Sequence, residues 1–292
     1  MYDDDEIIEQ NNLLFEKLGL LLNLNPCAIS ERMVKAMALK TGFGEVESMQ
    51  FLIADYLGID VVDSPIGKCL FNNYIKKMLK KQDKNIFISN PYYQNIKFDN
   101  IKLGNIEFGC GKYKPFELFV YDDIVKLKDG RLLPQVGYFD EEFIYPAIYE
   151  KGVLWMSVTP NEVNTMKEPI DKAFGRVLTF GLGLGYFAYM VSLKDEVKKI
   201  TIVESNETTI KIFEKYILPQ FKFKDKIEII KADAFTFAES KYKSGRYDYV
   251  FADIWHDAGD GLDCYTKFKR LEKLNPNIVY DYWIEKTIKC YL

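Results

Sequence analysis

The pattern of hydrophobic and polar positions changes twice along the chain. Residues 1–84 place apolar side chains every three or four positions, which predicts helices separated by turns such as Asn25-Pro26. Residues 85–151 switch to short alternating runs, for example FELFVYDDIVKL at 116–127, which predict β-strands joined by turns. We therefore expect a helical N-terminal region followed by a small β-rich domain.

Strands and helices alternate from residue 152 onward. Apolar, β-favouring runs lie at 176–180, 199–203, 226–231 and 247–252. A segment with helical periodicity follows each of them, and NIVYDYW at 277–283 predicts a fifth strand. This alternation predicts an α/β domain over 152–292, with a parallel sheet and right-handed crossovers.

A helix start precedes the first of these strands. Thr159-Pro160-Asn161-Glu162 has proline at the first helical position, where its missing N–H costs nothing. The spacing of Thr159 and Glu162 predicts a capping box, in which each side chain bonds the other residue's backbone N–H.

The first strand of the domain runs into a glycine turn. Gly181, Gly183 and Gly185 form G-x-G-x-G before a helical segment, a layout that aims backbone N–H groups at a nucleotide-like ligand. A dinucleotide fingerprint would need a small residue at position 186, which is Tyr186. Glu204 ends the next strand, at the interval where an acid holds ribose hydroxyls. The spacing favours a nucleoside ligand that is not a dinucleotide.

Over residues 155–257 these features resemble the class I S-adenosylmethionine-dependent methyltransferases, and nearest among them the spermidine-synthase-like branch. The resemblance implies a Rossmann-like sheet and S-adenosyl-L-methionine as the cofactor. The residues that it assigns to the cofactor are Gly181, Gly183, Gly185, Glu204, Asp233, Ala234 and Asp253. The chain ends before the antiparallel hairpin that completes such a sheet, so we expect a shorter sheet or one completed by earlier strands.

The resemblance also implies a role for each acid. Glu204 would accept both ribose hydroxyls, Asp233 would take the adenine amino group, and the backbone N–H of Ala234 would meet a ring nitrogen. Each of the two acids could instead have a purely structural role. Glu204 could be favoured by a helix dipole, and Asp233 could be the N-cap of the next helix.

The candidate reaction centre is the segment DIWHD at 253–257, which follows the fourth strand. Methyl transfer is an in-line displacement, so an enzyme chiefly positions the nucleophile and removes its proton. Asp253 matches the acid that deprotonates the attacking amine in spermidine synthases. His256 could be the base instead, because its unperturbed pKa lies near physiological pH. Trp255 could stack on adenine or on a flat substrate.

The β-rich segment stands where spermidine synthases carry a small β domain. Its run at 139–145 resembles their aspartate–glutamate–tyrosine signature, which assigns Tyr145 to the substrate. The family places His and Glu after this tyrosine, whereas Pro146 and Ala147 follow here. The family's Asp-Ser-x-Asp-Pro motif is also absent after the fourth strand, so the diamine site is in doubt.

These residues lead us to expect a methyltransferase that acts on a small-molecule acceptor. Aminopropyl transfer from the decarboxylated cofactor is the first alternative, and a non-catalytic S-adenosylmethionine-binding module is the second. A further alternative, an amino-methylating nucleic-acid enzyme, has a weak basis in Asn90-Pro91-Tyr92-Tyr93, which resembles an Asn-Pro-Pro-Tyr box. The second proline is missing and the box precedes the glycine turn, so a plain turn is favoured.

Composition and charge limit the partners, metal sites and cellular location that we expect. The net charge of −4 argues against a nucleic-acid partner, and the lysines between 76 and 84 are interpreted as the solvated face of one helix. His256 is the single histidine, so we expect no histidine-based metal site. Scattered cysteines, an acidic N-terminus and an apolar run at 13–24 too short to span a bilayer predict a cytoplasmic protein. The helical region could cap the site or form a homodimer.

Overall fold

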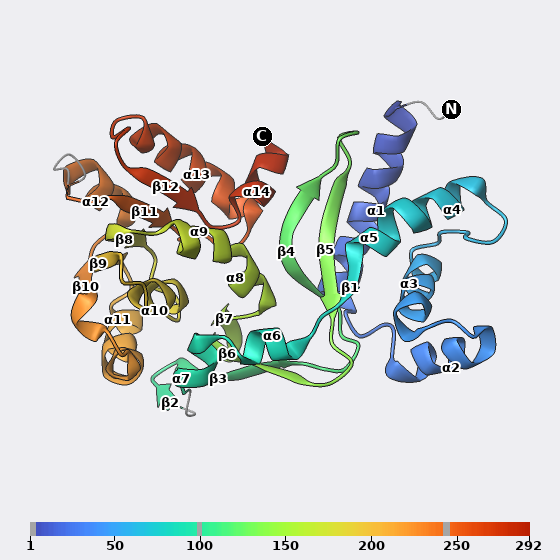
Figure 1. Ribbon diagram of the computed structural model, residues 1–292, viewed down its shortest axis with the longest axis horizontal. Coiled ribbons are helices and arrows are strands. Elements are labelled where there is room, and N and C mark those ends of the chain that lie inside the picture. Colours follow the sequence, from blue (N-terminus) through green and yellow to red (C-terminus); the bar gives the residue numbers. More distant parts are fainter. Residues whose placement is uncertain (1–3, 98–100, 242–245) are drawn as a thin grey trace. The chain divides into compact units, whose positions relative to one another are not determined.

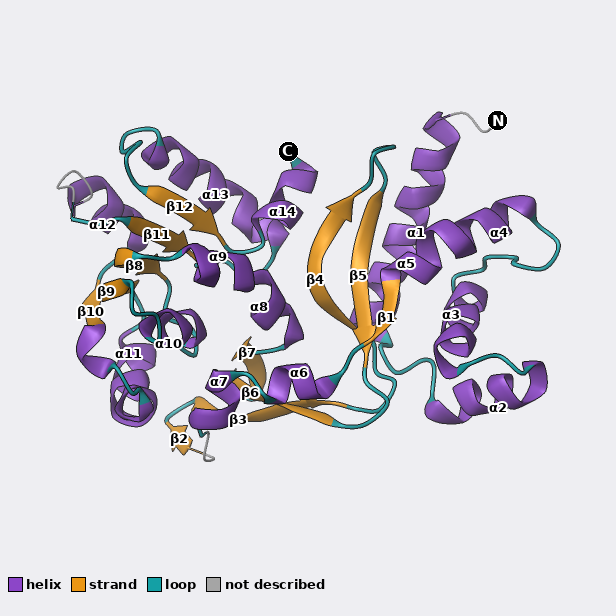
Figure 2. Ribbon diagram, viewed as in Figure 1, coloured by secondary structure: helices purple, strands orange, loops and turns teal. Residues whose placement is uncertain are grey.

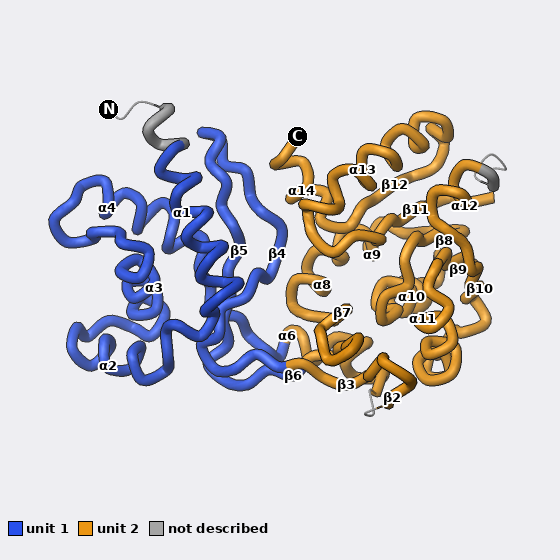
Figure 3. Tube along the Cα trace, turned by 180° about the vertical axis from the view of Figure 1, so that it is seen from behind, with its two compact units in different colours: residues 1–85, 112–144 blue, residues 86–111, 145–292 orange. Residues whose placement is uncertain are grey.

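The computed structural model describes residues 4–97, 101–241 and 246–292 (Figure 1). The chain forms two compact units, each with its own hydrophobic core (Figure 3). Unit 1 comprises residues 1–85 and 112–144, and unit 2 comprises residues 86–111 and 145–292. The residues expected to form one β-rich domain, 85–151, are therefore divided between the two units.

Unit 1 contains N-terminal helices and a small sheet. The helices are α1 (Asp4–Leu24), α2 (Glu31–Thr41), α3 (Glu45–Tyr56), α4 (Pro65–Leu70) and α5 (Lys76–Met78), with a π-helical turn at Phe71–Ile75. The sheet has the order β1-β5-β4, with β1 at Leu79–Lys81, β4 at Phe119–Lys126 and β5 at Leu132–Tyr138. Residues 4–84 are thus mainly helical, and β1 is their short exception.

Two sequence-based interpretations fail at residues 76–89. The lysines expected on one helix are spread over α5, β1 and α6 (Lys84–Ile88). The run NIFIS at 85–89 was expected to be a strand, but it lies mostly in α6, where Asp83 accepts a 2.9 Å hydrogen bond from the Asn85 N–H. Phe87 is buried whereas Ile86 and Ile88 are exposed, so only one of these three consecutive apolar side chains reaches a core.

Unit 2 is organised around a five-stranded parallel sheet (Figure 2). Its strands are β8 (Gly175–Phe180), β9 (Val197–Glu204), β10 (Ile227–Lys231), β11 (Tyr249–Ala252) and β12 (Val279–Tyr282). Their order is β10-β9-β8-β11-β12, so the chain reverses direction across the sheet between β8 and β11. This is the Rossmann-like α/β arrangement, and the predicted fold class is confirmed.

A helix follows each of these strands. These helices are α10 (Tyr186–Ser192), α11 (Glu207–Ile212), α12 (Ala234–Lys241), α13 (Ala258–Glu272) and α14 (Glu285–Ile288). Shorter helical turns lie at Phe213–Ile217 (η2), Leu218–Gln220, Lys224–Lys226 and Lys289–Tyr291. In the part of the chain that the structure describes, no further strand joins this sheet, which agrees with the shorter of the two expected forms.

A second sheet leads into the parallel one. Its order is β2-β3-β6-β7, with β2 at Ile101–Leu103, β3 at Ile106–Tyr113, β6 at Phe143–Glu150 and β7 at Val153–Ser157. Helix α7 (Pro91–Asn95) precedes it, and α8 (Pro160–Thr165) and α9 (Lys167–Lys172) connect β7 to β8. Among the described residues, no helix combines the length and apolarity needed to cross a membrane.

Candidate active site

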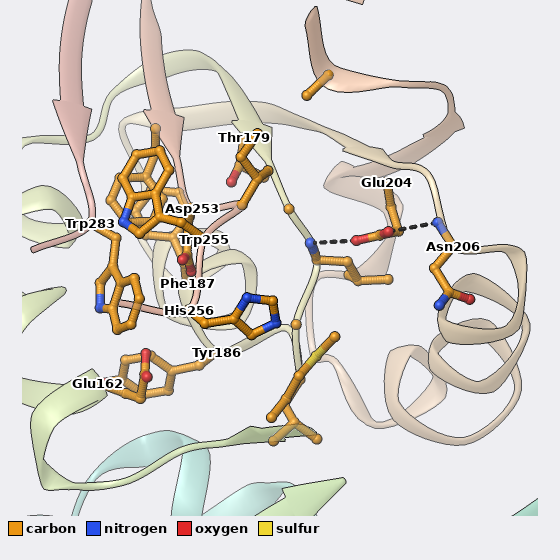
Figure 4. A pocket seen from close by; sticks show the side chains of 18 of the residues that line it. Glu162, Thr179, Tyr186, Phe187, Glu204, Asn206, Asp253, Trp255, His256 and Trp283 are labelled. Atoms are coloured by element: carbon orange, nitrogen blue, oxygen red, sulfur yellow. Dashed lines mark hydrogen bonds between the residues drawn. The ribbon is translucent and has the colours of Figure 1, made fainter. Parts of the chain in front are cut away.

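A cavity of about 660 Å³ opens at the carboxyl ends of the parallel strands of unit 2 (Figure 4). Residues from the loops after β8, β9, β10 and β11 line it, together with most of β7 and Glu162 of α8. Open α/β sheets bind ligands at this edge, where the strand order reverses. The topology therefore brings the sequence-predicted loops to one cavity.

The three glycines of the turn serve different purposes. Gly181 has φ +95°, and a Cβ there would lie 1.9 Å from the Asp253 carbonyl oxygen. Gly185 has φ +76°, and its Cβ would lie 2.3 Å from the Phe213 ring, so this glycine is needed for helix packing. Gly183 has φ +51° and open space around its Cβ position, and it lines the cavity with Gly181. Close approach of a ligand is thus available at Gly183.

Glu204 is fixed at the end of β9 by backbone donors. Its Oε2 accepts a 3.2 Å hydrogen bond from the Leu182 N–H, and its Oε1 accepts a 2.7 Å hydrogen bond from the Asn206 N–H (Figure 4). The side chain is half-buried in the cavity wall. Since an ionised carboxylate has about four lone-pair sites, each oxygen keeps acceptor capacity for a ligand.

Asp233 and Ala234 follow β10 and also line the cavity. Asp233 Oδ1 accepts 2.8 Å hydrogen bonds from the backbone N–H and the hydroxyl of Thr236. These bonds lower the pKa of Asp233 and cap the start of α12. The capping role is therefore present, and both of its bonds end on one carboxylate oxygen.

Asp253 lies directly after β11, where its backbone N–H donates to the Phe180 carbonyl at 2.9 Å. The carboxylate faces the cavity, and it has no hydrogen-bond or ion-pair partner among the described residues. Burial raises the pKa of Asp253 to about 7, although the nearby His256 lowers it somewhat.

Glu162 is a site residue that the sequence interpretation missed. Helix α8 begins at Pro160 as predicted, but the Thr159 side chain makes no capping hydrogen bond. Glu162 lines the cavity instead (Figure 4). Burial raises its pKa well above the usual range, and the charge of Asp253 raises it further. The capping spacing hid this role, and no local signal in the sequence distinguishes the two.

His256 and Trp255 differ sharply in exposure. The side chain of His256 is 70% exposed at the edge of the cavity, and its Nδ1 lies 3.0 Å from Asp260 Oδ2. Trp255 is only 4% exposed and packs closely against Gly261 of α13. Its indole N–H has no acceptor among the described residues. Trp255 therefore forms part of the cavity wall, and a ligand could not stack on both faces of its ring.

The Asn90-Pro91-Tyr92-Tyr93 turn packs beside the glycine loop. Asn90 Oδ1 accepts from the Tyr92 N–H at 2.9 Å and so caps α7, while its Nδ2 donates to the Tyr186 hydroxyl oxygen at 3.0 Å. The Tyr92 hydroxyl donates to the Leu184 carbonyl at 2.6 Å. The turn therefore supports the loop, and Tyr186 lines the cavity.

Tyr145 lies apart from these residues. Its ring packs against Gly111 of β3, where a Cβ would come within 2.3 Å of the ring. It is not among the residues that line the cavity, whereas Trp283, which sequence analysis did not single out, is. The Trp283 indole N–H donates to Thr165 Oγ1 at 3.0 Å, which fixes the ring beside α8.

The described residues contain no group of three or more His, Cys, Asp or Glu side chains suited to a metal ion. The cavity lining is nevertheless strongly acidic. It includes Glu162, Glu204, Asp233 and Asp253, and no Lys or Arg occurs among the described residues that line it. The site can therefore accept hydrogen bonds and attract cations.

Comparisons with known proteins give little overlap. No protein-family model and no curated protein matches the chain. One similar structure is a Klebsiella pneumoniae protein provisionally named an O-methyltransferase, with 16% identity over 33% of this chain and 43% of that one, at a TM-score of 0.27. Another is the human methyltransferase 10 domain containing protein, with 12% identity over 40% of this chain and 59% of that one, at a TM-score of 0.30. The chain thus spans about half of each protein, and similarities this low carry no inference about function.

Proposed function

We propose that the protein is an S-adenosylmethionine-dependent methyltransferase acting on a small-molecule acceptor. The observation that carries the proposal is the position of Glu204, whose carboxylate is held by two backbone N–H groups beside the open space at Gly183. Two oxygens with remaining lone pairs suit the two neighbouring hydroxyls of a ribose. Asp233 and the Ala234 N–H stand on the adjoining wall, where they could contact adenine.

The charge of the cavity supports this nucleoside over a dinucleotide. The described lining residues include no Lys or Arg to neutralise a pyrophosphate, and its ionised acids would repel one. The same carboxylates favour a sulfonium cation. When bound, S-adenosylmethionine would supply a methyl group activated by that positive sulfur.

Asp253 is the proposed general base. A base works best when its pKa lies near the operating pH, and burial places the pKa of Asp253 at about 7. The carboxylate faces the cavity without a competing partner among the described residues. His256, the alternative base, lies at the exposed edge with its Nδ1 beside Asp260. This geometry favours Asp253.

Aminopropyl transfer is the second candidate, as in the spermidine-synthase-like branch. One observation favours it: the described lining offers no Lys or Arg to neutralise the carboxylate of the methionine portion. The decarboxylated cofactor lacks that carboxylate and would meet no such problem. The two candidates therefore differ in which form of the cofactor binds.

Calorimetric titration with S-adenosylmethionine, its decarboxylated form and NAD tests both candidates. We expect S-adenosylmethionine to bind most tightly. Tighter binding of the decarboxylated form would move the assignment to aminopropyl transfer. Preference for NAD, or binding of none of the three, would contradict both.

The Glu204→Ala variant tests the residue that carries the proposal. Loss of hydrogen bonds to a charged group should weaken nucleoside binding by about 1.5–3 kcal/mol. Glu207→Ala is the matched control, because Glu207 is exposed on α11, pairs with Lys211 and Lys231, and does not line the cavity. Equal affinities of the two variants would mean that the ribose lies elsewhere.

A further inference from the structure

One hydroxyl proton in the cavity wall has no acceptor among the described residues. Tyr186 lies at the start of α10, lines the cavity and is only 5% exposed. The Asn90 side-chain nitrogen donates a 3.0 Å hydrogen bond to the Tyr186 hydroxyl oxygen. A hydroxyl has one proton and two lone pairs, so this bond uses the oxygen and leaves the proton free. The wall therefore holds a buried donor that a ligand can use.

The direction of the bond between Asn90 and Tyr186 follows from the other end of the amide. Asn90 Oδ1 accepts the Tyr92 N–H at 2.9 Å, so the group that faces the tyrosine hydroxyl is the NH₂ group, which can only donate. The Tyr186 ring packs edge-on against the buried Tyr92 ring, with their centroids 5.3 Å apart. The hydroxyl is thus held in place by packing, and its proton points away from Asn90.

The acids near Tyr186 differ in charge from those at the proposed nucleoside end of the cavity. At the nucleoside end, hydrogen bonds from the first turn of α12 lower the pKa of Asp233 and keep it ionised. Figure 4 shows Tyr186 and Glu162 on the side of the cavity away from Glu204. Burial, and to a smaller degree the charge of Asp253, raise the pKa of Glu162 well above the usual range, so Glu162 keeps its proton at neutral pH. An anionic group of a ligand is therefore repelled least near Tyr186.

We propose that the Tyr186 hydroxyl donates a hydrogen bond to the carboxylate of the cofactor's methionine portion, and so selects S-adenosylmethionine over its decarboxylated form. This inference rests on the proposed methyltransferase function and names a residue that recognises its cofactor. The described lining has no Lys or Arg for that carboxylate, and a neutral donor bonds an ionised acceptor more strongly than a neutral one. Burial raises the pKa of Tyr186 to about 12, so the hydroxyl keeps the proton that it donates. Asn90 acts through Tyr186 as a positioning residue.

Two ligands that differ by one carboxylate test this role directly. We would titrate the full chain by calorimetry with S-adenosylhomocysteine and with decarboxylated S-adenosylhomocysteine, which keeps the nucleoside, the sulfur and the amine. The wild type should bind S-adenosylhomocysteine at least about tenfold more tightly, because the hydrogen bond to its carboxylate is charge-assisted. Tyr186→Phe keeps the ring and its packing against Tyr92. This variant should lose most of the preference, while its affinity for the decarboxylated ligand stays within about twofold of the wild type.

Tyr189→Phe is the matched control. Tyr189 lies on the same helix, is 2% exposed and also packs against Tyr92, but it does not line the cavity. Removing its hydroxyl should leave the preference for S-adenosylhomocysteine as it is in the wild type. Asn90→Ser keeps a capping oxygen for α7 and removes the amide donor. It should lower the preference by itself and have no further effect on the preference when combined with Tyr186→Phe.

The outcomes separate this inference from the proposed function. If the wild type binds both ligands equally, or if Tyr186→Phe keeps the preference or loses affinity for both ligands alike, the inference is wrong and the methyltransferase proposal stands. Tighter binding of the decarboxylated ligand to the wild type would move the assignment to aminopropyl transfer and overturn the inference with it. If neither ligand binds to the wild type, the proposed function and this inference both fail.

Discussion

A surface carboxylate of unit 1 and two cavity carboxylates of unit 2 differ in whether they have a partner. In unit 1, Asp140 accepts a 2.6 Å hydrogen bond from Lys81 Nζ, which lowers the pKa of Asp140, and Lys81 also pairs with Glu45 at 3.2 Å. In unit 2, Glu162 and Asp253 face a cavity without such partners among the described residues, and burial raises the pKa of each.

This difference between paired and unpaired acids identifies the candidate site better than the number of acidic residues does. Paired acids on a surface serve solubility and contribute little to stability. Unpaired acids inside a cavity destabilise the folded chain, so their presence indicates a compensating ligand or a chemical task. The contrast also makes predictions of opposite sign for the two units.

The largest effect should come from Gly181→Ala, which moves the backbone that holds Asp253. Its Cβ would collide with the Asp253 carbonyl and would sit at a positive φ, so we expect a loss of about 3–5 kcal/mol in the free energy of unfolding. Gly130→Ala is the control in unit 1, because Gly130 has φ +85° but open space around it, and should cost about 1–2 kcal/mol. Denaturant unfolding of both variants measures this, and equal losses would contradict the proposed close contact.

The next effect concerns pH. The Asp253 pKa is raised from 3.8 to about 7, so the folded state holds the proton more tightly than the unfolded state. The contribution of Asp253 to the free energy of unfolding is therefore fully present below about pH 4. It is lost as the pH rises from there through 7. Asp253→Asn should remove this dependence and be more stable than the wild type at pH 8 by about 2–4 kcal/mol.

Asp140→Asn in unit 1 should act in the opposite direction. The pKa of Asp140 is lowered, so its stabilisation is present above about pH 4 and is lost as pH falls through the lowered value. The variant should therefore be slightly less stable than the wild type at pH 8. Denaturant unfolding from about pH 2 to pH 8 measures both variants. Parallel profiles for the wild type and Asp253→Asn would show that the pocket acid is not desolvated.

A smaller effect is expected at Asn90, which supports the cavity wall through Tyr186. Asn90→Ala removes both the cap of α7 and the bond to Tyr186, and should cost about 1–2 kcal/mol of stability. Asn90→Ser keeps a capping oxygen and should cost about half as much. Ser64→Ala removes a comparable cap in unit 1, where Ser64 Oγ accepts from the Gly67 N–H. Only the Asn90 variants should weaken nucleoside binding, and an effect of Ser64→Ala on binding would refute this distinction.

The smallest effect is predicted for Lys81→Ala in unit 1. Exposed ion pairs contribute about 0.2–1 kcal/mol, so the loss should stay within that range and shrink in high salt. A loss well above it, unaffected by salt, would mean that the acids of unit 1 depend on their partners far more than the comparison allows.

The local sequence pattern was sufficient to predict the parallel sheet and the loops that form the site. The alternation of strands and helices predicted the parallel sheet, and the interval from the glycine turn to Glu204 followed from the length of one βαβ unit. Strand ends in a parallel sheet meet at one edge, so Glu204, Asp233 and Asp253 could be expected to lie near one another. Sequence determined these features because each depends on neighbours a few positions away or on a regular crossover.

Tertiary structure decided the features that join distant segments. Glu162 has the spacing of a capping residue, yet the Thr159 side chain makes no capping bond and Glu162 lines the cavity together with Asp253. The turn at Asn90 resembles a known box, but its side chains are used to support the glycine loop. Residues 85–89 were expected to form a strand but lie mostly in α6, where only one of their three apolar side chains reaches a core. Burial raises the pKa of Glu162 and of Asp253, and the charge of Asp253 raises that of Glu162 further. These effects arise only when remote segments pack together.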